Sequence, residues 1–200
     1  PAMFDGALTV PSRLTERVAA GLGVLPRVAA QGLDIYARRM APAEADLRLA
    51  ALHRPWHHRL AELLERSRAR HGYAVLIDCH SMPSPTGIRP PQIVLGDRHG
   101  RTAAPALVAV IEGHFRGLGW RVARNAPYAG GHTTEAHGNV AAGIHAVQIE
   151  IDRALYMDGQ KLSRHGGFDQ VARAMTGLVH LLVETLPLLR LAPDWREAAE

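Results

Sequence analysis

The feature that most constrains this sequence is the alternation of short apolar segments with longer amphipathic ones. Four short segments have the apolar character of buried strands: 73–78, 92–95, 120–123 and 146–151. Between or after them, residues 103–116 and 168–186 carry apolar side chains at the three- and four-residue spacing typical of helices. Short strands that alternate with helices predict an α/β fold with a mainly parallel sheet.

The remaining segments carry weaker signals. Residues 1–32 show no period, and 33–36 could form a short extended piece. Residues 42–70 have a helical pattern, in which Pro55 is expected to break or kink the middle, so we expect two consecutive helices and not one long one. The glycine-rich stretch 125–143 is interpreted as a loop. There is no internal repeat or change in composition, so we expect a single domain over residues 1–200.

Composition and charge exclude several classes of protein. The apolar runs are short of the roughly 18–20 residues that cross a bilayer, so no membrane span is expected. The 23 basic and 19 acidic groups give a net charge of only +4, and the local excess at Arg66, Arg68 and Arg70 fits a solvated helix face better than a nucleic-acid site. A single cysteine, Cys79, indicates a reducing compartment such as the cytoplasm. Oligomeric state is not predicted.

A first polar cluster, residues 78–84, follows the apolar segment that ends at Ile77. Asp78 and His80 are two residues apart, so in an extended chain their side chains point to the same side. A carboxylate beside an imidazole fixes the tautomer of a metal-binding histidine. A polar strand end with a capped turn explains so short a motif equally well.

A second cluster surrounds Glu150, which lies between two isoleucines in an apolar segment. Gln148, Glu150 and Asp152 share one face of the expected strand. A buried carboxylate is costly unless it is paired, so Glu150 is a candidate general base with a raised pKa. The alternative is an amphipathic edge strand with Arg153 as a salt-bridge partner, and the residues alone favour neither.

The stretch between the two clusters is rich in polar groups and histidines. Glycines at 130 and 131 would let backbone amides approach a ligand. His132, His137 and His145 are candidate metal ligands, although their spacing matches no zinc signature. His53 and His57 have the four-residue spacing of helical zinc pairs, but Pro55 between them argues against a shared helix face.

These segments together resemble the N-formylglutamate amidohydrolase family. The resemblance covers nearly the whole chain, and its motifs occur in order at 21–26, 35–36, 43–60, 75–84, 125–138 and 144–157. It implies a three-layer α/β/α, phosphorylase/hydrolase-like fold related to zinc carboxypeptidases. The implied reaction is zinc-dependent hydrolysis of N-formyl-L-glutamate, or a close N-acyl amino acid, to formate and glutamate, the last step of one histidine-degradation route.

The resemblance also implies roles for individual residues. His80 matches the third zinc ligand, Glu150 matches the glutamate that activates water, and Asp78 would hold His80. The expected substrate-binding residues are Asn125, Tyr128, Thr133, Thr134 and Arg153.

The chain departs from the family at its start. Family members carry the first two zinc ligands, a histidine and an acidic residue, in a region without a counterpart here. We therefore expect the chain to be the C-terminal two thirds of a longer family domain. Otherwise His132 or His137 would complete the metal site, or the chain would be a non-catalytic small-molecule-binding module with an incomplete metal site.

Overall fold

The structure is a computed structural model that describes residues 19, 21, 25–29, 32–38 and 40–193. Most of the irregular segment predicted at 1–32 lies outside the described residues, as does part of the family motif at 21–26. The chain divides into two compact units, residues 1–60 and residues 61–200, which are described separately below. The assignment of residues 1–200 to one domain stays a prediction.

The described part of residues 1–60 is dominated by a helical run. Here α2 (Pro42–Arg48) is followed directly by the π-helical turn η2 (Leu49–His53) and by the start of α3 (Arg54–His71). This run contains two α-helices, as predicted, but they are separated at η2 and not at Pro55. Pro55 lies in the first turn of α3, where the missing N–H costs little, and the wider π-helical turn precedes it. The expected extended piece at 33–36 is reduced to an isolated bridge between Val28 and Asp34.

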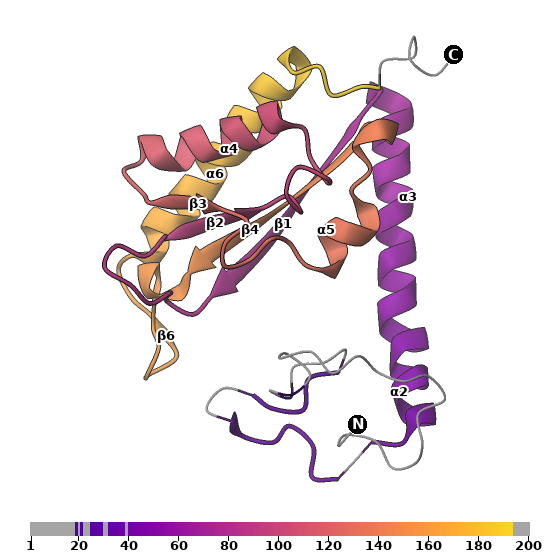
Figure 1. The fold of residues 1–200 in the computed structure, drawn as a ribbon, viewed down its shortest axis with the longest axis vertical. Coiled ribbons are helices and arrows are strands. Elements are labelled where there is room, and N and C mark those ends of the chain that lie inside the picture. The colour runs from indigo at the N-terminus through magenta and orange to yellow at the C-terminus, as the bar shows by residue number, and fades with distance from the viewer. Residues whose placement is uncertain (1–18, 20, 22–24, 30–31, 39, 194–200) are drawn as a thin grey trace. The chain divides into compact units, whose positions relative to one another are not determined.

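The unit 61–200 is built on a four-stranded sheet with the order β1-β4-β2-β3 (Figure 1). Its strands are β1 (Ala74–Met82), β2 (Ile93–Gly96), β3 (Val122–Arg124) and β4 (Ile144–Asp152). All four predicted strands are therefore present. Because β4 is an inner strand, the alternative of an amphipathic edge strand around Glu150 is wrong.

The sheet is mostly parallel, as predicted, with one exception. β1 pairs with β4 and β2 pairs with β3 in parallel, whereas β2 and β4 are antiparallel. The connections explain the difference. β3 follows β2 through helix α4 (Pro105–Gly117), as a parallel crossover requires, whereas β1 leads to β2 through a loop without a helix.

One face of this sheet carries the apolar core. Helices α4 and α6 (Phe168–Thr185) pack on it, as Figure 1 shows. Ile93, Leu95 and Ile149 reach this face from the strands and are fully buried. Phe115 of α4 is also fully buried and stacks on Trp120 at 5.7 Å between ring centroids. Burial of this apolar surface stabilises the unit. It also holds the strands in place, and these strands position the side chains on the opposite face of the sheet.

The opposite face is covered by α5 (His132–His137), a short helix that packs against β4 and β1. It lies inside the stretch 125–143, which the sequence predicted to be a loop throughout. The 3-10 turn η3 (Val140–Ala142) also lies there. Beyond β4, the chain forms η4 (Arg153–Leu155), the two-stranded pair β5 (Met157–Asp158) and β6 (Ser163–Arg164), and, after α6, η5 (Leu186–Leu188).

Helix α6 bears on the expectation that no segment spans a membrane, which stays a prediction. In the described part of the chain, residues 168–188 form one helix that is long and apolar enough to cross a membrane by length and composition. Its buried residues Val171, Leu178 and Leu182 belong to the apolar core, which is the place of a core helix. The length and composition of this helix are therefore only weak evidence that it spans a membrane.

Candidate active site

The polar residues of β1 and β4 lie side by side because of the register between these strands. Asp78 pairs with Gln148, and His80 pairs with Glu150. Side chains two residues apart in a strand point to the same face, so all four lie on the face opposite the apolar core. The two clusters that the sequence singled out, about 70 residues apart, thus form one site.

The imidazole of His80 lies between two carboxylates. Its Nε2 is 3.0 Å from Oδ1 of Asp78, and its Nδ1 is 4.0 Å from Oε1 of Glu150. A carboxylate accepts a hydrogen bond, so Asp78 favours the tautomer with the proton on Nε2. In the neutral ring, Nδ1 then has a free lone pair directed toward the side of Glu150.

Glu150 itself is a buried carboxylate, only 6% exposed. Burial raises its pKa, which the positive charges that His80 and Arg153 can carry and the hydrogen bond from Gln148 only partly oppose. Among the described residues, Oε2 of Glu150 and Oδ2 of Asp78 are buried oxygens without a hydrogen-bond partner. Two buried carboxylate oxygens without partners, in a site that also holds an imidazole, fit a cation or a polar ligand, because leaving them unpaired costs free energy.

Gln148 connects this site to the glycine-rich loop. Its side-chain oxygen accepts a hydrogen bond from the backbone N–H of Gly131 at 2.7 Å, and its side-chain nitrogen donates to Oε1 of Glu150 at 2.7 Å. Gln148 is 4% exposed. It was not among the predicted site residues, although its place two residues before Glu150 on the same face was a signal that could have found it.

Asn125 holds the start of the same loop. Its side chain donates to Oδ1 of Asp97 at 2.7 Å and accepts from the backbone N–H groups of Asp97 and His99. Asp97 is buried and follows β2 directly. These bonds fix the start of the glycine-rich loop next to the end of β2, and a role of Asn125 in substrate binding stays a prediction.

The other predicted loop residues lie in or near α5. Thr134 is fully buried, and its hydroxyl donates to the backbone oxygen of Gly131 at 2.8 Å, which makes it a structural residue of the first turn. Thr133 and Tyr128 are half-buried. His132 and His137 are the first and last residues of α5. Burial and the neighbouring His132 lower the pKa of His137, which favours a neutral ring able to act as a ligand or acceptor.

Arg153 follows β4 and lies at the edge of the site. Its guanidinium donates to the hydroxyl and to the backbone oxygen of Ser81, each at 3.2 Å. It is exposed, and its charge helps to lower the pKa of Glu150. An exposed guanidinium at this edge can accept a carboxylate from solution.

His145 is not a candidate ligand. Its Nδ1 accepts the backbone N–H of Ala104 at 3.2 Å, and its Nε2 donates to the backbone oxygen of Leu191 at 2.8 Å. The ring is 1% exposed and lies on the core side of β4. Both ring nitrogens are occupied, so the prediction for this residue is wrong.

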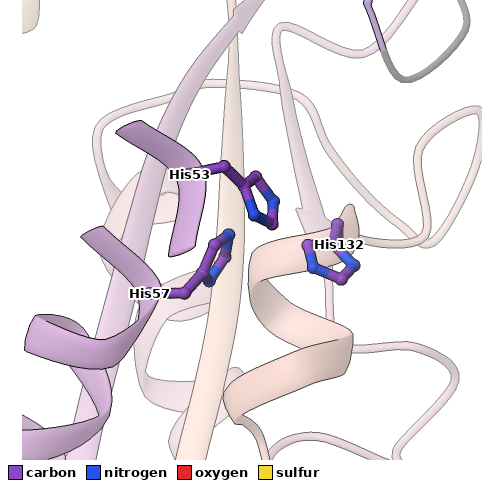
Figure 2. A group of neighbouring side chains, drawn as sticks. All are labelled: His53, His57 and His132. Atoms are coloured by element: carbon purple, nitrogen blue, oxygen red, sulfur yellow. The ribbon is translucent and has the colours of Figure 1, made fainter. Parts of the chain in front are cut away.

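His53 and His57 lie together within the unit 1–60. Because the helical run continues through Pro55, the two rings share a face, with centroids 4.2 Å apart (Figure 2). The sequence argument against a shared face is therefore wrong. The ring nitrogens lie within 4.8 Å of each other, a spacing at which two imidazoles can bind one ion.

Together, these residues define an α/β protein with an imidazole held by one carboxylate and facing a second, buried one at the edge of a glycine-rich loop. Such an arrangement can bind a divalent cation and accept a proton from water, which are requirements of metal-assisted hydrolysis. Comparison with known proteins identifies the class more closely. The N-formylglutamate amidohydrolase family matches residues 2–157, so the chain belongs to that family.

Individual relatives agree with this assignment. The chain is 34% identical over 174 residues to N-formylglutamate deformylase of Pseudomonas aeruginosa, and 31% identical over 146 residues to N-formylglutamate deformylase of Pseudomonas putida. These alignments cover 84% and 70% of this chain, and 65% and 55% of the relatives. The chain thus spans about two thirds or less of the length of these proteins.

Solved structures support the fold. The crystal structure of N-formylglutamate amidohydrolase from Ralstonia eutropha is similar with a TM-score of 0.80 and 34% identity, over 89% of this chain and 66% of that one. A gene product of Agrobacterium tumefaciens is similar with a TM-score of 0.58 and 23% identity, over 80% of this chain and 61% of that one. The second likeness concerns the fold alone.

Proposed function

We propose that this chain carries the catalytic base and one metal ligand of an amidohydrolase that cleaves the formyl amide of N-formyl-L-glutamate, or of a close N-acyl amino acid, into formate and the free amino acid. The observation that carries the proposal is the pairing of His80 with Glu150 across β1 and β4, with Asp78 behind the imidazole. Membership of the family supports the substrate class. The same reasoning supports a place at the end of histidine degradation and a fold related to zinc carboxypeptidases.

The donor set fits a divalent zinc ion. His80 offers Nδ1 because Asp78 takes its other nitrogen, which is the usual arrangement around a zinc-bound histidine. The buried oxygens without partners, on Asp78 and Glu150, would be relieved by a nearby cation. When bound, zinc acidifies water and polarises a carbonyl group. A catalytic zinc has three protein ligands, so His132 and His137 remain candidates for further ligands.

The chain's own residues account for the proton transfers. Glu150 takes a proton from the water whose oxygen attacks the formyl carbon, and burial helps because it makes the carboxylate a stronger base. As the carbon–nitrogen bond breaks, the same carboxyl group returns the proton to the departing amine. Formate and the amino acid leave, and Glu150 is again ionised.

Substrate recognition is assigned to the rim of the site. Arg153 is the cation placed to bind a carboxylate of the substrate, and Tyr128 and Thr133 are half-buried hydrogen-bonding groups of the adjoining loop and helix. Asn125 and Thr134 act through the loop that they hold. A reducing compartment stays a prediction, which rests on Cys79 being the only cysteine.

Formate release by the full chain tests the proposal. N-formyl-L-glutamate, N-formyl-L-aspartate and N-acetyl-L-glutamate should be compared, with zinc content measured on the same samples. We expect Glu150→Gln to lower formate release by about 10²- to 10⁴-fold, because a general acid–base group contributes that much. We expect His80→Ala to lower both release and zinc content.

Matched controls come from helix α6. Glu184→Gln and His180→Ala change exposed residues of the same types, and both should keep full activity and zinc content. Full activity of His80→Ala or Glu150→Gln would refute the catalytic proposal. Binding of N-formyl-L-glutamate without zinc and without formate release would instead identify a non-catalytic binding module.

A further inference from the structure

Gln148 is the buried polar side chain that joins the candidate base to the glycine-rich loop. It is 4% exposed and lies on the inner strand β4, on the same face as Glu150. Each end of its amide makes one hydrogen bond, to Gly131 and to Glu150. A buried amide satisfied at both ends is a rigid connection, because turning it would leave polar atoms unpaired.

The direction of this amide is determined by chemistry. The backbone N–H of Gly131 can only donate, so the side-chain oxygen of Gln148 must face it. The NH₂ group then has to face Glu150, at 2.7 Å from Oε1. The orientation therefore does not depend on telling oxygen from nitrogen by position alone.

The two oxygens of Glu150 consequently differ. Oε1 accepts the N–H of Gln148 and cannot also carry a proton on the side that faces this donor. Oε2 is buried and has no hydrogen-bond partner among the described residues. Oε1 therefore has a fixed donor, whereas the hydrogen-bonding capacity of Oε2 is unused in the described part of this structure.

We propose that Gln148 is a positioning residue, which holds Oε1 of Glu150 so that Oε2 is the oxygen that exchanges a proton during hydrolysis. The proposal rests on the proposed function of Glu150 and adds which of its atoms acts and what orients it. Orientation of a proton acceptor matters because a misplaced group loses much of its effect on rate.

The loop is built to accept this contact. A methyl group at residue 131 would lie 3.1 Å from the side-chain oxygen of Gln148, closer than most carbon contacts. Gly131 therefore allows the amide to reach the loop backbone. The side chain of Gln148 thus couples the position of the glycine-rich loop to the orientation of the Glu150 carboxylate.

The test compares Gln148→Met with Gln148→Glu in the full chain. Methionine is similar in length but makes neither hydrogen bond. Glutamate can still accept from Gly131 but, when ionised, cannot donate to Glu150. We expect each variant to lower kcat for formate release by about 10-fold or more, as loss of an orienting partner does, with KM changed much less.

Thr102→Val is the matched control for a purely structural effect. Thr102 is 3% exposed, and its hydroxyl donates to the backbone oxygen of Ala146 at 2.8 Å, so the variant also loses one buried hydrogen bond. It should lower the free energy of unfolding without lowering kcat, although by less than Gln148→Met, which loses two hydrogen bonds. Wild-type kcat in folded Gln148→Met would overturn the proposal.

A second measurement does not depend on activity. In an NMR spectrum of ¹⁵N-labelled protein, Glu150→Gln should shift the side-chain NH₂ signals of Gln148, because their acceptor loses its charge. Unchanged signals would refute the contact even if the chain were inactive. Shifted signals in a chain that releases no formate would support the contact and locate the failure in the proposed function.

Discussion

The two faces of the sheet in the unit 61–200 are buried to a similar degree but by different means. Along β4, Ile149 points into the apolar core and is fully buried, while the next residue, Glu150, points to the opposite face and is 6% exposed. Burial of Ile149 stabilises the fold. Burial of Glu150 costs free energy and is only partly offset by Gln148. A buried carboxylate on an inner strand therefore points to a functional role more than to a stabilising one.

The largest effect is expected from Ile149→Asp, which places a carboxylate on the apolar face without a partner. The expected loss is several kcal/mol, comparable to the roughly 5–15 kcal/mol that keeps a domain folded. Circular dichroism and urea unfolding would show a largely unfolded chain. Ile149→Val, as a control, should cost about 0.5–1.5 kcal/mol. If Ile149→Asp unfolded cooperatively with a free energy of unfolding within about 1 kcal/mol of wild type, burial on the apolar face would not be what stabilises the fold.

Gly96→Ala tests how closely the loop packs on the polar face. A methyl group at residue 96 would clash with the backbone nitrogen of Gly130 and would lie 2.7 Å from the carbonyl carbon of Ala129. Because backbone atoms must move, we expect a loss of about 1–3 kcal/mol in the free energy of unfolding together with a lower kcat. Urea unfolding and formate release measure the two effects. Unchanged values for both would show that the loop is not seated there.

The buried carboxyl of Glu150 should make the free energy of unfolding depend on pH. Burial raises the pKa of this carboxyl in the folded protein, so its contribution is present below the unfolded value of 4.5 and is lost as the pH rises through the folded pKa. In protein treated with a chelator, Glu150→Gln should gain stability relative to wild type as the pH increases from 4 to 8. Urea unfolding at several pH values measures the difference in the free energy of unfolding between Glu150→Gln and wild type. Glu184→Gln is the control. If the difference in the free energy of unfolding did not change with pH, the pKa of Glu150 would not be raised in the folded protein.

The smallest expected effect lies on the helix that covers the apolar face. A methyl group at Gly113, in the interior of α4, would meet no atom within 4 Å. Gly113→Ala should therefore raise the free energy of unfolding by about 0.5–1 kcal/mol and leave kcat unchanged. Thermal unfolding would detect this as a higher Tm. A lower Tm would show that α4 has less room than its surroundings indicate.

Much of the fold could be predicted because its signals are local. The apolar runs identified all four strands, and the spacing of leucines and valines identified α4 and α6. Helix α5 was missed because it has only six residues and follows several glycines. The two helices of residues 42–70 were predicted, but they separate before Pro55, because a proline in the first turn of a helix costs little.

The site was predictable only within each strand. The two-residue spacing placed Asp78 with His80, and Glu150 with Gln148, on common faces. No local pattern could align His80 with Glu150, since their pairing depends on β1 and β4 being neighbours. The same limit applies to Asn125, whose amide is visible in the sequence while its partner Asp97 comes from another part of the chain.

The ring of His145 links a central strand to the tail of the chain, since its Nε2 donates to the backbone oxygen of Leu191. That oxygen lies beyond the last helical turn, η5, in a stretch that would otherwise be a natural place to trim the protein. Shortening the chain before residue 191 would leave a buried N–H without an acceptor and open the core beside β4. Affinity tags and fusion partners therefore should not replace the residues up to Leu191.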